Sequence, residues 1–258
     1  MYRIAALAML GLFLCLPVHA TDVEKEKRWA EQIVDALIDG DAVWLDAGGH
    51  EFLAIETPDT DESAKRALIV VHGVGVHPDW DQVIKPIRVD MTEQGWHTLS
   101  IQMPVLANDA ESYQYTPLFD EVPARFEAAI KYLQEQGMQQ IVIAAHSMGA
   151  AMSAFYLAET PNSPVKAFVA VGLNAANKDP RVNAANSLAK IKIPVIEIYG
   201  SEDIPPVLET AQLRAEAAQK AGNDYDQIVV EGAGHFFDNH EETLLEHVHQ
   251  WLIKQGYK

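Results

Sequence analysis

One segment indicates the fold more clearly than any other: Ile141-Val142-Ile143-Ala144-Ala145-His146-Ser147-Met148-Gly149-Ala150. Its first five residues are apolar and partly β-branched, which is typical of a strand buried on both faces. The residues from Met148 onward favour a helix, so a strand passes into a helix through a tight turn that carries Ser147. A small-x-Ser-x-Gly sequence in that context is typical of a nucleophile elbow, although Ala145 stands where a glycine is usual. The alternative role of Ser147 is to cap an ordinary helix.

Strands and helices alternate on both sides of this segment. Apolar runs predict strands at residues 43–45, 51–55, 67–71, 96–101, 141–145, 165–171, 193–199 and 227–230. Helical spacing of apolar residues predicts helices at residues 22–38, 80–94, 122–136, 148–158, 207–220 and 241–252. This order requires crossover connections, so it predicts one α/β domain over residues 21–258, with a doubly wound, mostly parallel sheet flanked by helices.

Two further side chains complete a possible catalytic set with Ser147. Asp203 follows the strand predicted at residues 193–199, and His235 lies in the small-residue loop Gly232-Ala233-Gly234-His235-Phe236-Phe237. In this arrangement His235 accepts the Ser147 proton, while Asp203 fixes the tautomer of the imidazole and stabilises the imidazolium. Glu202 is a competing acid, and Asp203 has the alternative role of a helix cap.

A glycine-rich turn supplies the fourth part. His72-Gly73-Val74-Gly75 directly follows the strand predicted at residues 67–71. Backbone N–H groups in such a turn stabilise the negative oxygen of an acyl-transfer intermediate. The sequence therefore predicts an oxyanion hole made by the amides of Met148 and Val74. The alternative is a turn that only shapes the sheet.

These motifs, from about residue 40 to the C-terminus, resemble the α/β-hydrolase superfamily. Three further segments resemble a bacterial family of unassigned function within it: His77-Pro78-Asp79-Trp80, Pro86-Ile87-Arg88 and Gly95-Trp96-His97-Thr98-Leu99-Ser100. The resemblance implies an exported protein with the α/β-hydrolase fold, and it carries over the triad Ser147, Asp203 and His235. Cap domains in this fold usually precede the acid. Only residues 172–192 are available there, so no large cap domain is expected.

One long connection could cover the site. Residues 104–121 carry the aromatic side chains Tyr113, Tyr115 and Phe119. One hypothesis is that this connection forms a wall or small lid over Ser147 and that these three residues bind the substrate. The alternative is a packed surface loop, because connections of this length are often but not always functional.

Charge and the N-terminal segment restrict the function further. The 258 residues include 19 Lys and Arg against 37 Asp and Glu, a formal net charge of −18 that disfavours nucleic acid and anionic lipid as partners. Arg3, the apolar run over residues 4–18 and the site Val18-His19-Ala20 predict a signal peptide, residues 1–20, cleaved after Ala20. The single Cys15 lies within it. We therefore expect a periplasmic or secreted protein with no stable membrane anchor.

No cofactor and no metal are expected. His247 and His249 point to different sides of a predicted helix, and His240 lies about 10 Å from His247.

The main interpretation is an exported serine hydrolase that cleaves a small-molecule or envelope-derived carboxylic ester through an acyl-enzyme. The alternatives are a thioester or amide acyl hydrolase of the cell envelope, and a catalytically inert binding protein with the hydrolase fold. The sequence does not indicate an oligomeric state.

Overall fold

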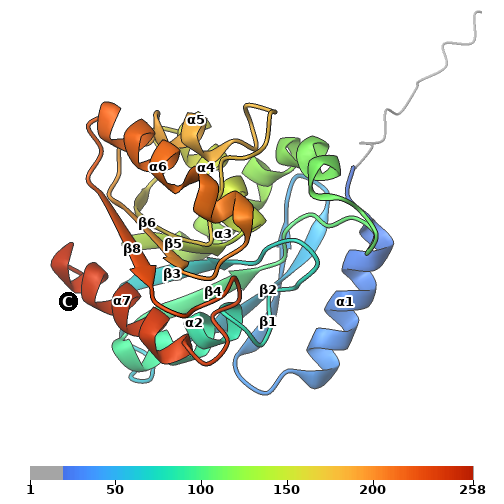
Figure 1. Ribbon diagram of the computed structural model, residues 1–258. Coiled ribbons are helices and arrows are strands. Elements are labelled where there is room, and N and C mark those ends of the chain that lie inside the picture. The colour runs from blue at the N-terminus through green and yellow to red at the C-terminus, as the bar shows by residue number, and fades with distance from the viewer. Residues whose placement is uncertain (1–19, 258) are drawn as a thin grey trace, which may run out of the picture.

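The structure is a computed structural model that describes residues 20–257, and it contains one eight-stranded sheet with helices on both faces (Figure 1). The strands are β1 (Asp41–Asp46), β2 (Glu51–Thr57), β3 (Arg66–Val71), β4 (His97–Ile101), β5 (Gln140–His146), β6 (Val165–Val171), β7 (Val195–Gly200) and β8 (Tyr225–Val230). Their order in the sheet is β1-β2-β4-β3-β5-β6-β7-β8. The pairs β1–β2 and β2–β4 are antiparallel, and the other pairs are parallel. The predicted signal peptide, apart from Ala20, lies outside the described residues.

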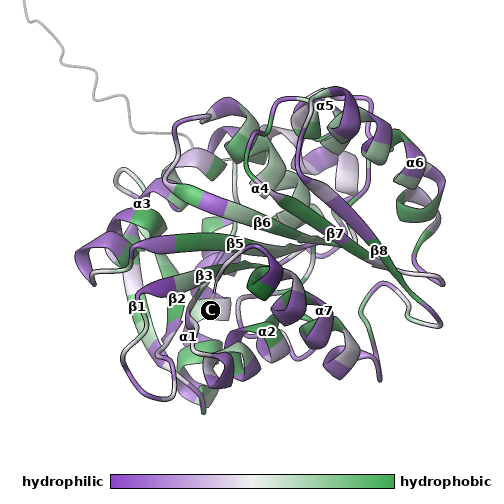
Figure 2. Ribbon diagram, turned by 90° about the vertical axis from the view of Figure 1, so that its left-hand side faces the viewer, coloured by the Kyte–Doolittle hydropathy of each residue, from purple (hydrophilic) through white to green (hydrophobic). Residues whose placement is uncertain are grey.

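The central strands are apolar along their length because helices bury both of their faces. Figure 2 shows mostly hydrophobic colour along β5 and β7, whereas the helices around them carry hydrophilic residues as well. The helices are α1 (Val23–Ala36), α2 (Ile84–Asp90), α3 (Val122–Glu135), α4 (Met148–Glu159), α5 (Ala184–Leu188), α6 (Pro205–Lys220) and α7 (Glu241–Lys254), with 3-10 helices η1 (Met91–Gln94) and η2 (Ser112–Asp120). No helix within residues 20–257 is long and apolar enough to cross a bilayer.

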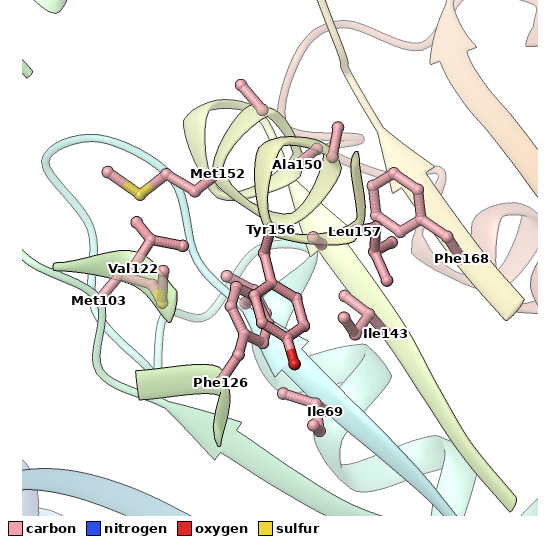
Figure 3. Close-up of a cluster of buried hydrophobic side chains, with 14 of the residues drawn as sticks. Ile69, Met103, Val122, Phe126, Ile143, Ala150, Met152, Tyr156, Leu157 and Phe168 are labelled. Carbon is pink, nitrogen blue, oxygen red and sulfur yellow. The ribbon is translucent and has the colours of Figure 1, made fainter. Parts of the chain in front are cut away.

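Two apolar layers hold the helices on the sheet. On one face, α2 and α7 pack against β3, β5, β6 and β7. On the other face, α3 and α4 pack against the same central strands. Figure 3 shows this second layer, in which Phe126 of α3 and Tyr156 of α4 lie above Ile69 and Ile143. Their rings are stacked, with centroids 4.7 Å apart. The helix α1 covers β2 near the antiparallel end of the sheet.

The structure confirms the predicted mostly parallel sheet flanked by helices. The prediction of a helix beginning at residue 80 is wrong, since residues 81–83 form a turn and α2 begins at Ile84. Val83 has a φ of 59°, a left-handed conformation that β-branched residues rarely adopt and that a helix cannot contain. The connection between β6 and β7 contains only the five-residue helix α5, so no large cap domain is inserted there.

Strand register brings the predicted catalytic segments to one edge of the sheet. Val71 of β3 pairs with Ala145 of β5, and His146 pairs with Val171 of β6. The turns that follow these strands therefore begin side by side. Gly200 of β7 pairs with Val230 of β8 at the same edge. Ligands of open α/β sheets bind at this carboxyl edge.

Candidate active site

Ser147 lies on a strained turn between β5 and α4. Its backbone has φ 55° and ψ −122°, a region that residues with a side chain occupy only when their surroundings enforce it. Neighbouring backbone enforces it here. A Cβ atom at Gly149 would lie 2.2 Å from the carbonyl oxygen of His72, and one at Gly73 would lie 2.9 Å from Ser147 Cβ. Both positions therefore require glycine, and the turn has the geometry of a nucleophile elbow.

Three of the predicted side chains form one hydrogen-bonded chain. The distance from Ser147 Oγ to His235 Nε2 is 2.9 Å, and the distance from His235 Nδ1 to Asp203 Oδ1 is 2.6 Å. Asp203 is 4% exposed, and its Oδ1 also accepts a bond from the Ile204 N–H group. Glu202 is exposed and makes no bond to His235. Of the two acids that the sequence left open, the structure places Asp203 against the histidine.

His72 fixes the glycine-rich turn after β3. Its Nε2 accepts a bond from the Met103 N–H group, and its Nδ1 donates to the Gly73 carbonyl oxygen, each over 2.9 Å. Burial lowers the pKa of His72 to about 3, so the ring stays neutral in this tautomer. In a trans peptide the C=O and N–H groups point in opposite directions. The N–H group of Val74 is therefore directed away from His72.

Val74 and Met148, the predicted oxyanion donors, have backbone N–H groups without an acceptor among the described residues. Both residues line the same cavity as Ser147. The Met148 N–H group is free because Met148 is the first residue of α4, where no preceding turn supplies a carbonyl. The two donors are thus available to a bound ligand.

His146 is a second buried histidine in contact with the site. Its Nε2 donates to the carbonyl oxygen of His235 over 2.9 Å, and the two ring centroids are 4.8 Å apart. Burial lowers the pKa of His146 to about 3, with a smaller contribution from His235. A neutral His146 therefore holds the backbone of the loop that carries His235.

Removal of the bond from His146 should impair His235. We expect His146→Leu to lower kcat on a small ester by about tenfold to a hundredfold, because a small misplacement of a catalytic group has an effect of that size. His146→Gln retains a donor at a similar reach and should recover most of the loss. Steady-state kinetics of both variants test this, and equal rates for both variants and the wild type would contradict it.

The two buried histidines also predict loss of stability in acid. Their pKa values in the fold, about 3, lie below the ordinary value of 6.5, so the unfolded chain binds protons that the folded chain excludes. The two histidines therefore do not lower the free energy of unfolding above pH 6.5, and they lower it progressively as the pH falls from 6.5 towards 3. Each histidine contributes at most about 1.4 kcal/mol per pH unit to this loss.

Urea unfolding between pH 7 and pH 5, above the range in which carboxyl groups titrate, measures this contribution. We expect the free energy of unfolding of His146→Gln to depend less steeply on pH than that of the wild type. Identical slopes would show that His146 is not held neutral.

The cavity beside Ser147 has a volume of about 580 Å³, within the range of small-molecule sites. Residues from six segments form its walls: Gly73, Val74, Val76, Ser112, Tyr113, His146, Ser147, Met148, Ala151, Asn174, Ala176, Asn177, Lys178, Val182, Ile204, Pro206, His235 and Phe236. Apolar side chains predominate, which suits the acyl or alkyl part of a small ester.

Of the three aromatic residues expected to bind substrate, only Tyr113 lines the cavity. Tyr115 and Phe119 are 2% and 0% exposed and belong to the core, so the expectation of a wall made by all three is corrected. The segment forms the 3-10 helix η2, in which residues three apart share a face. Tyr115 and Leu118 face inward for this reason, and Tyr113 is exposed. The apolar spacing of residues 115, 118, 119 and 122 is a sequence signal that could have revealed this.

The sequence did not indicate the contribution of the connection after β6. Four residues of this connection line the cavity, although its length alone indicates only that no large cap is inserted: Asn174, Asn177, Lys178 and Val182. Phe236, next to His235, was likewise not singled out. These residues have no periodic pattern, so their position depends on the tertiary structure. No group of three or more His, Cys, Asp or Glu side chains in the described part of the chain is arranged to hold a metal ion.

Solved structures similar to this chain share its fold. Est1E from Butyrivibrio proteoclasticus is 16% identical with a TM-score of 0.65, and the match covers 84% of this chain and 99% of that one. A dienelactone hydrolase from Anabaena variabilis is 16% identical with a TM-score of 0.67, covering 83% and 96%. Esterase Est2 from Thermogutta terrifontis, with propionate bound, is 18% identical with a TM-score of 0.68, covering 84% and 95%. No curated protein matches the sequence.

The fold and these neighbours define the chain as a protein of the α/β-hydrolase fold. Within that class, it belongs to the family described as "Protein of unknown function (DUF3530)", whose model matches residues 17–120 and 117–254.

Proposed function

We propose that this protein is an exported serine hydrolase that cleaves carboxylic esters through an acyl-enzyme. The observation that carries the proposal is the chain of hydrogen bonds from Asp203 through His235 to Ser147, which opens onto the cavity. Several structural neighbours are described as esterases, and one, Est2, is described as phosphoramylated by tabun. The export component rests on the signal-peptide pattern of residues 1–20 and is tested by locating the protein in cell fractions.

The residues would act in a definite order. Ser147 Oγ attacks the ester carbonyl carbon while His235 Nε2 accepts its proton, and the N–H groups of Val74 and Met148 bind the oxyanion that forms. Collapse of this intermediate expels the alcohol, which takes the proton from His235. Water then attacks the acyl-enzyme with His235 as base, and the carboxylic acid and free Ser147 are released. Asp203 holds His235 in the required tautomer and stabilises the imidazolium in both steps.

A fluorophosphonate probe tests the activated serine directly. Residues 21–258 are treated with the probe, and intact mass is read for the wild type and for Ser147→Ala. One adduct on the wild type and none on the variant supports the proposal. No adduct on folded wild-type protein would contradict it and favour a binding protein with an inert triad.

A further inference from the structure

The connection after β6 forms one wall of the cavity, and three polar side chains in it have hydrogen-bond donors that bond to no described residue. Asn174 Oδ1 accepts a bond from the Ala176 N–H group over 3.3 Å, and Asn177 Oδ1 accepts one from the Asp179 N–H group over 2.9 Å. In an asparagine side chain the oxygen can accept from an N–H group and the NH₂ group cannot, so these bonds fix the orientation of both amides. No acceptor within residues 20–257 bonds to either Nδ2 group. Both NH₂ groups are therefore free to donate.

Lys178 adds a cation to the same wall. It is the one cavity-lining residue with a permanent charge, and its ammonium forms no ion pair with any described residue. The adjacent Asp179 is already paired with Arg181, over 3.3 Å. Although the chain has a net charge of −18, this wall of the cavity therefore carries an unpaired positive charge. We call Asn174, Asn177 and Lys178 the donor wall.

The backbone of the donor wall is held in place before any ligand binds. Asn183 Nδ2 donates to the carbonyl oxygens of Ala175 and Asn177 over 2.9 and 3.0 Å. The Ala175 N–H group donates to Thr210 Oγ1 of α6 over 3.0 Å. Such preorganisation reduces the entropy lost when a ligand binds. The rest of the cavity lining is mainly apolar and includes Val74, Ala151 and Ile204.

We propose that the donor wall binds a carboxylate of the substrate, so that the preferred substrates are esters with a carboxylate group separated from the scissile bond by a short apolar spacer. Three donors without a competing acceptor match the lone pairs of a carboxylate, and the charge of Lys178 strengthens these bonds. The apolar walls receive the spacer, and Ser147 lies in the same cavity. This inference rests on the proposed function for the cleavage step but not for binding.

Two matched ester pairs test the proposal. In the first pair the carboxylate lies on the acyl side: 4-nitrophenyl hydrogen glutarate is compared with 4-nitrophenyl methyl glutarate. In the second pair it lies on the alcohol side: 4-carboxyphenyl acetate is compared with 4-(methoxycarbonyl)phenyl acetate. The measured quantity is the ratio of kcat/KM for the anionic ester to that for its neutral partner, at low and at high salt.

For the wild type we expect this ratio to be about ten in at least one pair, and we expect it to arise from a lower KM for the anionic ester rather than from a higher kcat. Lys178→Met should lower that ratio about tenfold, and Lys178→Arg should retain most of it. Lys190→Met is the matched control, because it removes the same charge from a lysine that pairs with Glu159 and does not line the cavity. This control separates a local contact from the effect of net charge. A wild-type ratio near one in both pairs, or a ratio that Lys178→Met leaves unchanged, would overturn the proposal.

A binding measurement separates this inference from the proposed function. Calorimetry with Ser147→Ala and the four esters should show tighter binding of a carboxylate ester, lost in the double variant Ser147→Ala/Lys178→Met. If the wild type cleaves no ester but this binding is seen, the proposed function fails and the carboxylate site stands. If neutral esters are cleaved and carboxylate esters are preferred neither in kcat/KM nor in binding, the proposed function stands and the carboxylate site is contradicted.

Discussion

Ser147→Ala is expected to lower kcat on a small carboxylic ester by about a millionfold, close to the rate of a site without its catalytic residues. The hydroxyl oxygen is the atom that becomes acylated, and no other side chain is within bonding distance of His235 Nε2 among the described residues. An alanine at this position leaves His235 without a proton to accept. The residual rate would come from the free N–H groups of Val74 and Met148 and from substrate binding.

Ser153→Ala provides a matched control for this variant. Ser153 lies in the same helix as Met148, and its Oγ donates to the Gly149 carbonyl oxygen without lining the cavity. We expect its kcat to stay within about threefold of the wild type, since the substitution removes one buried hydrogen bond. Steady-state rates over six orders of magnitude require active-site titration, so that traces of wild-type enzyme are not counted. A loss below about a hundredfold in Ser147→Ala would contradict nucleophilic catalysis by this residue.

Asp203→Asn has the second-largest expected effect, a loss of about ten-thousandfold in kcat. The carboxylate accepts the bond from His235 Nδ1 over 2.6 Å, and an amide at this position can present its NH₂ group instead. That group would favour the tautomer with a proton on Nε2, which cannot accept the proton of Ser147. The Ile204 N–H group donates to the same Oδ1 atom. An asparagine that keeps its oxygen at this point offers His235 Nδ1 only a neutral acceptor, which stabilises the imidazolium less, so kcat should fall in either orientation of the amide.

Glu202→Gln is the control for Asp203→Asn. It makes the same chemical change at the neighbouring acid, whose side chain is exposed and does not bond to His235. We expect its kcat to remain within about twofold of the wild type. Comparable losses in the two variants would show that Glu202 shares the role of the acid. Unchanged rates in both would show that His235 needs no carboxylate partner.

Local residue pattern predicts the buried strands and the close backbone contacts of this protein, but it predicts the orientation of side chains in long connections less well. Continuous apolar runs such as residues 67–71 and 141–145 predict strands because a parallel strand is buried on both faces. Glycines at residues 73 and 149 report close backbone approach, which a single sequence can show. Tyr115 and Phe119, by contrast, lie in a long connection, where residue type alone does not distinguish an aromatic side chain in the core from one at the cavity, and only their spacing with Leu118 and Val122 indicates burial.

The helix that begins at residue 84 rather than 80 illustrates a second kind of failure. Trp80 takes part in contacts with distant parts of the chain: its ring packs against His77, which in turn packs against Trp29 of α1. Its Nε1 donates to Gln82 Oε1, and Gln82 Nε2 donates to Asp238 in the loop after His235. These contacts hold residues 81–83 in a turn, with Val83 in a left-handed conformation. Local helix propensity does not include such contacts.

Local sequence pattern was sufficient to predict the alternation of strands and helices, the mostly parallel sheet and the segments that carry Ser147, Asp203 and His235, because apolar periodicity and glycine placement are local consequences of burial. Three features required the folded structure: Asp203 rather than Glu202 contacts His235, His72 and His146 hold the two loops of the site, and Asn174 and Lys178 line the cavity. Each of these depends on which side chains meet across the carboxyl edge of the sheet, and the residues that meet are far apart in the chain, 89 positions for His146 and His235. Strand register and loop conformation determine these contacts, and neither can be predicted from local residue spacing.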